Sequence, residues 1–353
     1  MNAASAQPGP PPDPATVAIG ARESRAVVLA LAEVLRERFA FPERGADAAR
    51  KIEAMEKRGV FRDARNAQVL LDLIEKEIAP VVNDRHFRAR YFGPEAVAGF
   101  REGPPSAAEL AAFHEEVRLR GGEIPEVRWL AGNVGYLRIS LFMDAPPSIE
   151  KLAAAFDLLS DTAALIIDLR GTPGGEPAGV ANVIGHLVTE RTATVRAFGP
   201  GSETPERTFH AEPRTPAYVG KPVYVLTNGR TASGAEEFAY DLKAMGRATL
   251  VGETTAGAAT PGGYRPLAHG FVAFIPMQVV VNVITGAHWE GVGVRPDVAI
   301  PAQESLNCAH RLALQEILAS AQGTQHDLVQ EGIDSLDSTD PACKRQSPTP
   351  SRD

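Results

Sequence analysis

The stretch LIIDLRGTPGGEPAG, residues 165–179, decides the fold class. It opens with apolar residues that run up to Asp168, and a loop rich in glycine and proline then leads into a helical pattern at 175–188. An uninterrupted apolar run of this kind is typical of a strand buried on both faces of a parallel sheet. The loop therefore lies at the carboxyl end of a buried strand, where ligands gather in open α/β sheets.

On its own, this loop is more readily a plain strand-to-helix turn than a binding site. It is not a Walker A loop, because no Gly-Lys-Ser/Thr follows it, and it lacks the spacing G-x-G-x-x-G. Backbone N–H groups in such a loop can still point at an anion. Since Pro173 has no N–H, Gly174 or Gly175 must supply any donor there.

Short runs of similar character recur from Glu126 onward. They are rich in β-branched and aromatic residues, which predicts strands at 126–131, 134–142, 164–169, 222–228, 248–252, 271–277 and 279–284. Helical patterns lie between and after them, at 148–160, 175–188, 233–246 and 303–322. Alternating strands and helices predict a layered α/β core with mostly parallel pairing over residues 126–323.

The N-terminal part of the chain has the helical period instead. Apolar residues recur at helical spacing in three segments separated by proline or glycine, at 24–39, 45–59 and 64–82. We expect a helical bundle over 23–92, joined to the core by a connecting segment, 93–125, that carries one further helix. The proline-rich residues 1–22 and the polar residues 324–353 are predicted to be disordered tails.

Composition excludes several classes of protein. Hydrophobic residues make up 44% of the 353 residues and charged residues 23%, which is ordinary for a globular protein. The formal net charge of −8 gives no electrostatic reason to expect a nucleic-acid partner. No apolar run approaches the ~20 residues that span a bilayer, so we expect no membrane span. No signal peptide is visible before Arg22, which favours a cytoplasmic protein.

The two cysteines, Cys308 and Cys343, are too few for a disulfide framework and lack the spacing of a metal site. We interpret them as one buried thiol and one tail thiol. Paired Cys/His spacing and H-E-x-x-H are both missing, so no metal or other cofactor is expected.

A second stretch, PVYVLTNGRTASGAEEFAYDLKAMG at residues 222–246, has the same strand–turn–helix pattern. Ser233 and Glu236 match the capping box S-x-x-E, which accounts for both residues without any chemistry. A serine at this position also lies at the positive end of the helix dipole, where a nucleophile faces a developing oxyanion. Gly234 would let a backbone N–H approach closely.

Three further groups are candidates with ordinary structural alternatives. His86, in VVNDRHFRARY, is one histidine of eight, and a surface role is its default interpretation. Glu290, beside Gly291 in TGAHWEGVGVRPD, alone fits a solvated turn carboxylate. Asp168 and Arg170 fit a structural ion pair better than a catalytic pair.

Together these motifs resemble the tail-specific (C-terminal-processing) serine peptidase family. The segments that carry the resemblance are IIDLRGTPGG at 166–175, TNGRTASGAEEFAYDLKAMGRATLVGETTAG at 227–257 and HWEGVGVRPDV at 288–298, in that order. NDRHFRARY, at 83–91, falls where one branch carries its histidine, the branch that contains the tricorn core and interphotoreceptor retinoid-binding protein. The similarity covers about residues 25–320, and it implies a core of the ClpP/crotonase type.

The resemblance also implies the residues of the site. In one arrangement of the family a lysine about twenty-five residues after the serine activates it. Here that place is Gly257-Ala258-Ala259, and the chain has no lysine between Lys243 and Lys344, so that dyad is excluded.

The other arrangement uses serine, histidine and glutamate. It implies Ser233 as nucleophile, His86 as base and Glu290 as the acid near the histidine, with the N–H groups of Gly174 and Gly234 as the oxyanion hole.

The expected function is thus hydrolysis of peptide bonds by a serine peptidase through an acyl-enzyme, with a peptide or protein as substrate and no cofactor. The family's PDZ module has no counterpart in the short segment 93–125. A non-catalytic carrier of apolar ligands on the same fold is the alternative, with Ser233 only a helix cap, and an esterase with the same triad is a third interpretation. Homo-oligomers occur on this fold, although the sequence marks no interface.

Overall fold

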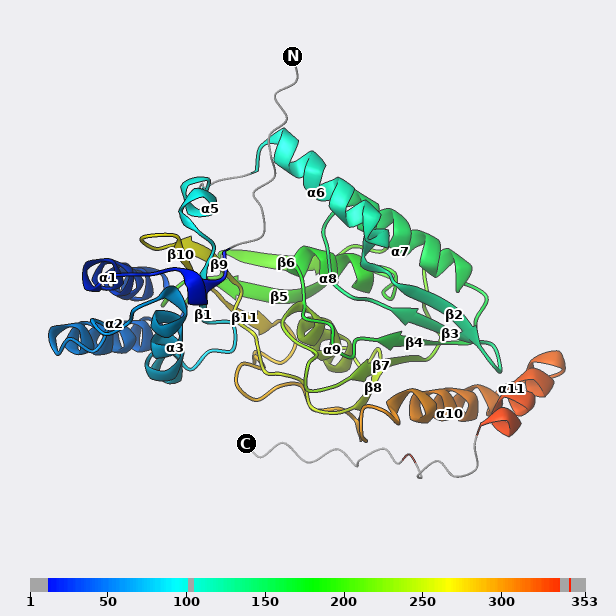
Figure 1. Ribbon diagram of the computed structural model, residues 1–353. Helices are drawn as coiled ribbons and strands as arrows, with labels where there is room; N and C mark the ends of the chain where they lie inside the picture. The colour runs from blue at the N-terminus through cyan, green and yellow to red at the C-terminus, as the bar shows by residue number, and fades with distance from the viewer. Residues whose placement is uncertain (1–11, 101–104, 337–342, 344–353) are drawn as a thin grey trace, which may run out of the picture. The chain divides into compact units, whose positions relative to one another are not determined.

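The computed structural model describes residues 12–100, 105–336 and Cys343. The chain divides into two compact units. The first unit comprises residues 1–104, 197–206 and 260–280, and the second unit comprises residues 105–196, 207–259 and 281–353. Figure 1 labels most of the helices and strands of both units.

Helices make up most of the first unit. Their bounds are η1 Pro14–Thr16, α1 Ala21–Arg38, α2 Pro42–Lys57, α3 Ala67–Glu77, α4 Ala79–Val82 and α5 Pro94–Ala98. Local sequence sets several of these starts: Pro42 occupies the first position of α2, and the Asn66 side chain caps α3 by accepting from the N–H of Val69 at 2.9 Å. The helices predicted at 24–39, 45–59 and 64–82 are confirmed.

The first unit also contains an antiparallel sheet in the order β1-β10-β9. Its strands are β1 Arg88–Tyr91, β9 Gly262–Pro266 and β10 Phe271–Pro276. Phe271, Ala273 and Ile275 of β10 lie in one hydrophobic core with apolar residues of α1, among them Val27 and Leu31. Helices and sheet thus share a single core, and burial of this apolar surface stabilises the unit.

The second unit is built on a six-stranded sheet in the order β12-β8-β7-β4-β3-β2. The strands are β2 Glu126–Leu130, β3 Val134–Arg138, β4 Ala164–Asp168, β7 Val223–Thr227, β8 Thr249–Gly252 and β12 Val298–Ala299. All pairs are parallel except β2 with β3. Every residue of β4 and β7 is buried, as the continuous apolar runs predict.

Helices cover this sheet, which confirms the predicted layered α/β core. The helices of the second unit are α6 Ala107–Leu119, η2 Gly121–Glu123, α7 Pro146–Leu158, α8 Pro177–Ile184, α9 Gly234–Ala244, α10 Ser305–Leu318 and α11 Thr324–Ser335. Figure 1 shows α10 along one side of the sheet and α7 and α8 on the other. Ala309, Ala313 and Leu314 of α10 pack on Ile166 and Leu226 of the central strands. A smaller sheet, β11-β5-β6, consists of β5 Thr192–Phe198, β6 Arg207–Ala211 and β11 Val279–Asn282.

The register of β4 with β7 decides where the site forms. Asp168, the last residue of β4, pairs with Leu226 near the end of β7. Since the two strands are parallel, the loops that follow them leave from the same edge of the sheet. The N–H of Ala232 donates to the carbonyl of Thr172 at 3.0 Å, and the Thr231 hydroxyl donates to the carbonyl of Leu169 at 2.8 Å.

The predicted domain boundaries need correction. We expected a purely helical bundle at 23–92 and an uninterrupted core at 126–323, but residues 197–206 and 260–280 belong to the first unit. The reason is strand pairing over a long distance: β1, inside the expected bundle, pairs with β10.

The expected tails are also partly wrong. Within 1–22 the structure describes residues 12–22, where Val17 and Ile19 pack against the core of the first unit. Within 324–353, α11 forms because Val329 is buried in the core of the second unit. The other residues of these segments, Cys343 excepted, lie outside the described ranges.

The two cysteines are joined, which corrects the interpretation as separate thiols. A disulfide links Cys308, on α10, with Cys343. Their Cα atoms are 5.7 Å apart, within the usual range for a disulfide.

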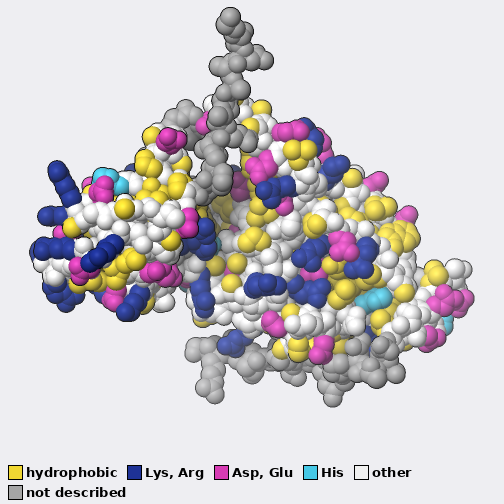
Figure 2. Space-filling view, in the orientation of Figure 1, with side chains coloured by type: hydrophobic (Ala, Val, Ile, Leu, Met, Phe, Trp, Pro, Cys, Tyr) yellow, Lys and Arg dark blue, Asp and Glu magenta, His cyan; other side chains and the backbone are white. Residues whose placement is uncertain are grey.

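Charged side chains of both signs lie over the surface of α1–α3, as Figure 2 shows. Arg36 on α1 pairs with Glu53 on α2, and Lys51 on α2 pairs with Glu77 on α3. None of the described helices combines the length and the apolar character needed to cross a bilayer.

Candidate active site

Ser233 occupies a strained turn between β7 and α9. Its backbone has φ 53° and ψ −125°, a conformation that residues with a Cβ rarely adopt. A helix N-cap ordinarily has extended backbone, and its side chain accepts a hydrogen bond from the first turn. The Ser233 hydroxyl makes no such cap bond to the described residues of α9. Capping therefore does not account for the serine, although half of the predicted capping box forms.

That half is the contact of Glu236 with the backbone of Ser233, whose N–H donates to Oε2 at 2.9 Å. The Glu236 side chain is fully buried, yet it has other donors as well: the hydroxyl of Thr255 and the N–H groups of Gly257 and Ala258. Burial raises the pKa of Glu236 above its ordinary value, and these hydrogen bonds act in the opposite direction.

The glycine loop predicted to face the serine does so. A Cβ built on Gly174, which has φ +125°, would lie 2.6 Å from the Cβ of Ser233 and 2.9 Å from the N of Gly234. A Cβ on Gly234 would in turn lie 2.8 Å from the carbonyl oxygen of Gly175. Only glycine fits this approach, so the loop after β4 and the turn after β7 are in direct backbone contact.

Backbone groups of both loops lie beside Ser233. Gly234 is the first residue of α9, and the first N–H groups of a helix have no partner within the helix. The carbonyl of Gly174 accepts from the N–H of Phe142 at 2.9 Å, which fixes the loop's orientation. The structure thus brings Ser233, Gly174 and Gly234 together as predicted.

Glu290 lies in the same unit, in the loop before β12. Its Oε2 accepts from the N–H of Ala259 at 2.5 Å. Trp289, beside it, is buried and donates through its indole N–H to the carbonyl of Ala258 at 3.1 Å. The Glu290 loop is therefore held against residues 258–259, the continuation of the segment that contacts Glu236.

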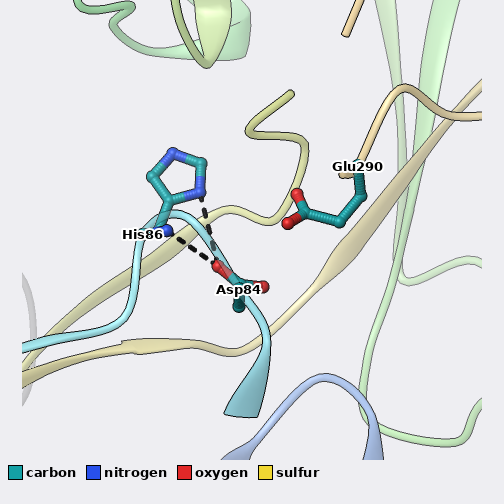
Figure 3. A group of neighbouring side chains, drawn as sticks. All are labelled: Asp84, His86 and Glu290. Atoms are coloured by element: carbon teal, nitrogen blue, oxygen red, sulfur yellow. Dashed lines mark hydrogen bonds and ion pairs between the residues drawn. The ribbon is translucent and has the colours of Figure 1, made fainter. Parts of the chain in front are cut away.

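His86 lies in the first unit, between α4 and β1, and only 14% of its side chain is exposed. Its ring stacks on Phe274 with centroids 5.8 Å apart. Figure 3 shows Asp84 beside it: the His86 N–H donates to Asp84 Oδ1 at 2.8 Å, and Nδ1 lies 3.9 Å from the same oxygen. Burial lowers the pKa of His86; Asp84 opposes this effect and Arg88 adds to it.

Thr260 sets the orientation of this histidine. Its hydroxyl donates to Asp84 Oδ2 at 2.6 Å, so its oxygen is left to accept from His86 Nδ1, 3.3 Å away. Nδ1 then carries the proton, and Nε2 is the basic nitrogen. Asp84 and Thr260 were missed in the sequence, where NDRH looks like an ordinary polar turn; only the carboxylate two residues before His86 was a usable signal.

Asp168 and Arg170 form the structural pair that the sequence favours. Arg170 donates to Asp168 through Nε and Nη2, and the Tyr136 hydroxyl donates to it at 2.7 Å. Burial alone would raise the pKa of Asp168. The hydrogen bonds from Arg170 and Tyr136 and the charge of Arg170 lower it more, so the pKa lies below its usual value. The pair also fixes the end of β4, because Arg170 Nη1 donates to the carbonyl of Ala302 at 2.7 Å.

Both oxygens of Asp84 already accept hydrogen bonds within the first unit, one from the N–H of His86 and one from the hydroxyl of Thr260. Asp84 is therefore placed to orient His86.

The chain is similar to known peptidases. Peptidase family S41 matches residues 133–300, the range that contains the Ser233 turn, the Gly174 loop and Glu290. The carboxy-terminal processing protease CtpB of Bacillus subtilis (strain 168) is 28% identical over 193 residues, which are 52% of this chain and 38% of that protein. The chain thus spans less than half the length of this curated relative.

Solved structures share the fold. The photosystem II D1 C-terminal processing protease superposes with a TM-score of 0.54 at 17% identity, over 79% of this chain and 94% of that chain. The tricorn protease gives a TM-score of 0.50 at 15% identity, over 90% of this chain and 37% of that chain. The predicted resemblance to this family is confirmed, since residues 133–300 are similar to peptidase family S41.

Proposed function

We propose that the protein is a serine-type peptidase that hydrolyses peptide bonds through an acyl-enzyme on Ser233. The observation that carries the proposal is the turn itself, a serine in a strained conformation whose hydroxyl does not cap its helix. A carrier of apolar ligands has no need of such a serine, since strained residues cluster where they serve chemistry. The match to peptidase family S41 over the same residues supports the same conclusion.

In the proposed reaction Ser233 Oγ attacks the carbonyl carbon of the scissile bond. His86 Nε2 removes the hydroxyl proton and later gives it to the leaving amine. A water molecule, activated by the same nitrogen, then hydrolyses the ester and releases Ser233. The mechanism requires His86 Nε2 to come within hydrogen-bond reach of Ser233 during the reaction, and these residues belong to different units.

The N–H groups of Gly174 and Gly234 are proposed to bind the oxyanion. Removing one such donor costs about 3–4 kcal/mol of transition-state stabilisation. The dipole of α9 adds to the same field, because its positive end lies at Ser233.

The acid of the triad has two candidates. Glu290 is the residue that the family resemblance implies, and Asp84 is the carboxylate that lies against His86 in the first unit. We propose that Asp84, with Thr260, fixes the tautomer of His86, and we retain Glu290 as the predicted acid of the triad. Comparing Asp84→Asn with Glu290→Gln separates the two candidates: removing the carboxylate that stabilises the charged ring should lower the pKa of His86, measured by NMR on the unliganded protein.

The test of the function is the intact mass of the protein after exposure to a fluorophosphonate probe. A single adduct on Ser233, lost in Ser233→Ala and slowed at least about 100-fold in His86→Ala, is expected for a serine activated by a general base. A folded wild-type protein that takes up no probe, or a His86→Ala variant that reacts at the wild-type rate, would contradict the proposal.

A further inference from the structure

One buried carboxylate, that of Glu236, joins the serine turn to the loop that follows β8. Oε2 accepts the N–H of Ser233 at 2.9 Å and the N–H of Ala258 at 2.8 Å. Oε1 accepts the N–H of Gly257 at 2.6 Å and the hydroxyl of Thr255 at 2.5 Å. All four partners are donors, so they suit the ionised carboxylate, which only accepts.

Helix capping explains just one of these four bonds. The bond from Ser233 is the local, i to i+3 contact of a capping box. The other three come from residues 19 to 22 positions further along the chain, which lie outside α9 and so do not cap it. Hydrogen bonds between an ionised group and neutral donors are short and about twice as strong as those between neutral groups. Glu236 therefore forms a junction between the serine turn and residues 255–258, two segments of the second unit.

The junction extends to Glu290. Ala259, the residue after the last donor, gives its N–H to Glu290 Oε2 at 2.5 Å. The Thr255 oxygen also accepts from the N–H of Val294 at 2.7 Å, on the other side of the Glu290 loop. A displacement of residues 255–258 would consequently move the Glu290 loop as well as the serine turn.

We propose that Glu236 is a positioning residue that sets both the backbone of Ser233 and the place of the Glu290 loop. The proposal rests on the proposed function in so far as Ser233 is the nucleophile. The structural part of the proposal is that one carboxylate fixes the position of residues 255–258. This part does not depend on whether the protein is an enzyme.

The variants follow from the contacts. Glu236→Gln keeps the shape of the side chain but replaces one carboxylate oxygen with an NH₂ group. Each Glu236 oxygen accepts from two donors, so the NH₂ group, itself a donor, would leave two buried donors without an acceptor. Glu236→Asp keeps the charge and shortens the reach by one methylene. Glu237→Gln is the matched control, because Glu237 is the next residue of α9, is also buried, and has no bond to the junction among the described residues.

The experiment measures two quantities on the full chain. Hydrogen–deuterium exchange followed by mass spectrometry reports the protection of peptides that cover 228–238 and 253–260. The rate constant of fluorophosphonate labelling reports the reactivity of Ser233. In Glu236→Gln and Glu236→Asp we expect exchange in both peptides to rise at least about tenfold and labelling to fall at least about 100-fold, while Glu237→Gln stays within about threefold of wild type.

Unchanged exchange in a folded Glu236→Gln variant would overturn the proposal, and so would an equal loss in Glu237→Gln. Failure of the proposed function has a different signature: wild-type protein that does not label, while exchange still rises in Glu236→Gln. If Glu236→Gln does not fold, Thr255→Val is used instead: it removes the hydroxyl that donates to Glu236 and accepts from the N–H of Val294, and it must raise exchange in 253–260 and slow labelling for the proposal to stand.

Discussion

Gly174→Ala tests the approach of the glycine loop to the nucleophile. The new Cβ would lie 2.6 Å from the Ser233 Cβ and 2.9 Å from the Gly234 nitrogen, distances that Cβ atoms do not tolerate. Both neighbours are fixed in place: the N–H of Ser233 is bonded to Glu236, and Gly234 is the first residue of α9. Neither can move aside as the end of a flexible side chain would.

Two costs add at this position. A residue with a Cβ at φ +125° is strained by about 1–3 kcal/mol. The overpacking against Ser233 adds about 1–3 kcal/mol. We therefore expect the free energy of unfolding to fall by about 2–6 kcal/mol. In the part of the population that folds, displacement of one oxyanion donor should slow the labelling of Ser233 by about 10²–10³-fold.

Gly171→Ala is the matched control, because Gly171 lies in the same loop with φ +80° and a Cβ there would meet its nearest neighbour, Arg230 Nη2, at 3.8 Å. It carries backbone strain without the clash. Urea unfolding and the labelling rate are measured for both variants. If Gly174→Ala folds and labels like Gly171→Ala, the loop does not approach the serine as described, and the oxyanion-hole assignment is refuted.

Three further predictions concern buried charges and the histidine. Burial raises the pKa of Asp241 to about 7 and that of Glu237 well above its ordinary value, so the folded state binds protons that the unfolded state has released. For Asp241 the stabilising effect is complete below the ordinary carboxyl pKa near 4 and is lost as the pH rises through about 7. Asp241→Asn should therefore raise Tm relative to wild type more at pH 8 than at pH 5, and a constant difference would contradict this. Asp168→Ala leaves the Arg170 guanidinium without its carboxylate and should cost about 3–5 kcal/mol in urea unfolding, whereas a loss below about 1 kcal/mol would mean the pair behaves as an exposed one. Thr260→Val should leave His86 free to change tautomer and slow the labelling of Ser233, and an unchanged ¹⁵N spectrum of the His86 ring would count against the role of Thr260.

The sequence was sufficient to predict those strands and helices that are marked by a local pattern of apolar residues. The strands at 164–168 and 223–227 are continuous apolar runs, so their burial and parallel pairing could be predicted. The meeting of Ser233 with the glycines of the two loops was implied by the family resemblance, and in the structure both loops follow adjacent parallel strands. The strands at 207–211 and 262–266, RTFHA and GGYRP, contain charged residues and glycine and gave no such pattern.

The division into units could not be foreseen. Residues 262–276 join the helical segment because β10 pairs with β1, about 180 residues earlier, and no local pattern encodes a pairing at that distance. The helix at 324–335 was missed since its apolar residues are few, and the buried Val329 is what fixes it. The role of Asp84 depends on Thr260, 176 residues away, and only the folded chain shows it.

The measurement that tests the central claim most directly is cleavage of a peptide library, with the products identified by mass spectrometry, by wild-type protein, Ser233→Ala and His86→Ala. We predict that wild-type protein cleaves internal or C-terminal peptide bonds and that Ser233→Ala yields no product above background, with a loss of at least about 100-fold in His86→Ala. Cleavage by Ser233→Ala at the wild-type rate would contradict the account. Hydrolysis of activated esters without cleavage of any peptide would contradict it too, and would point to an esterase instead.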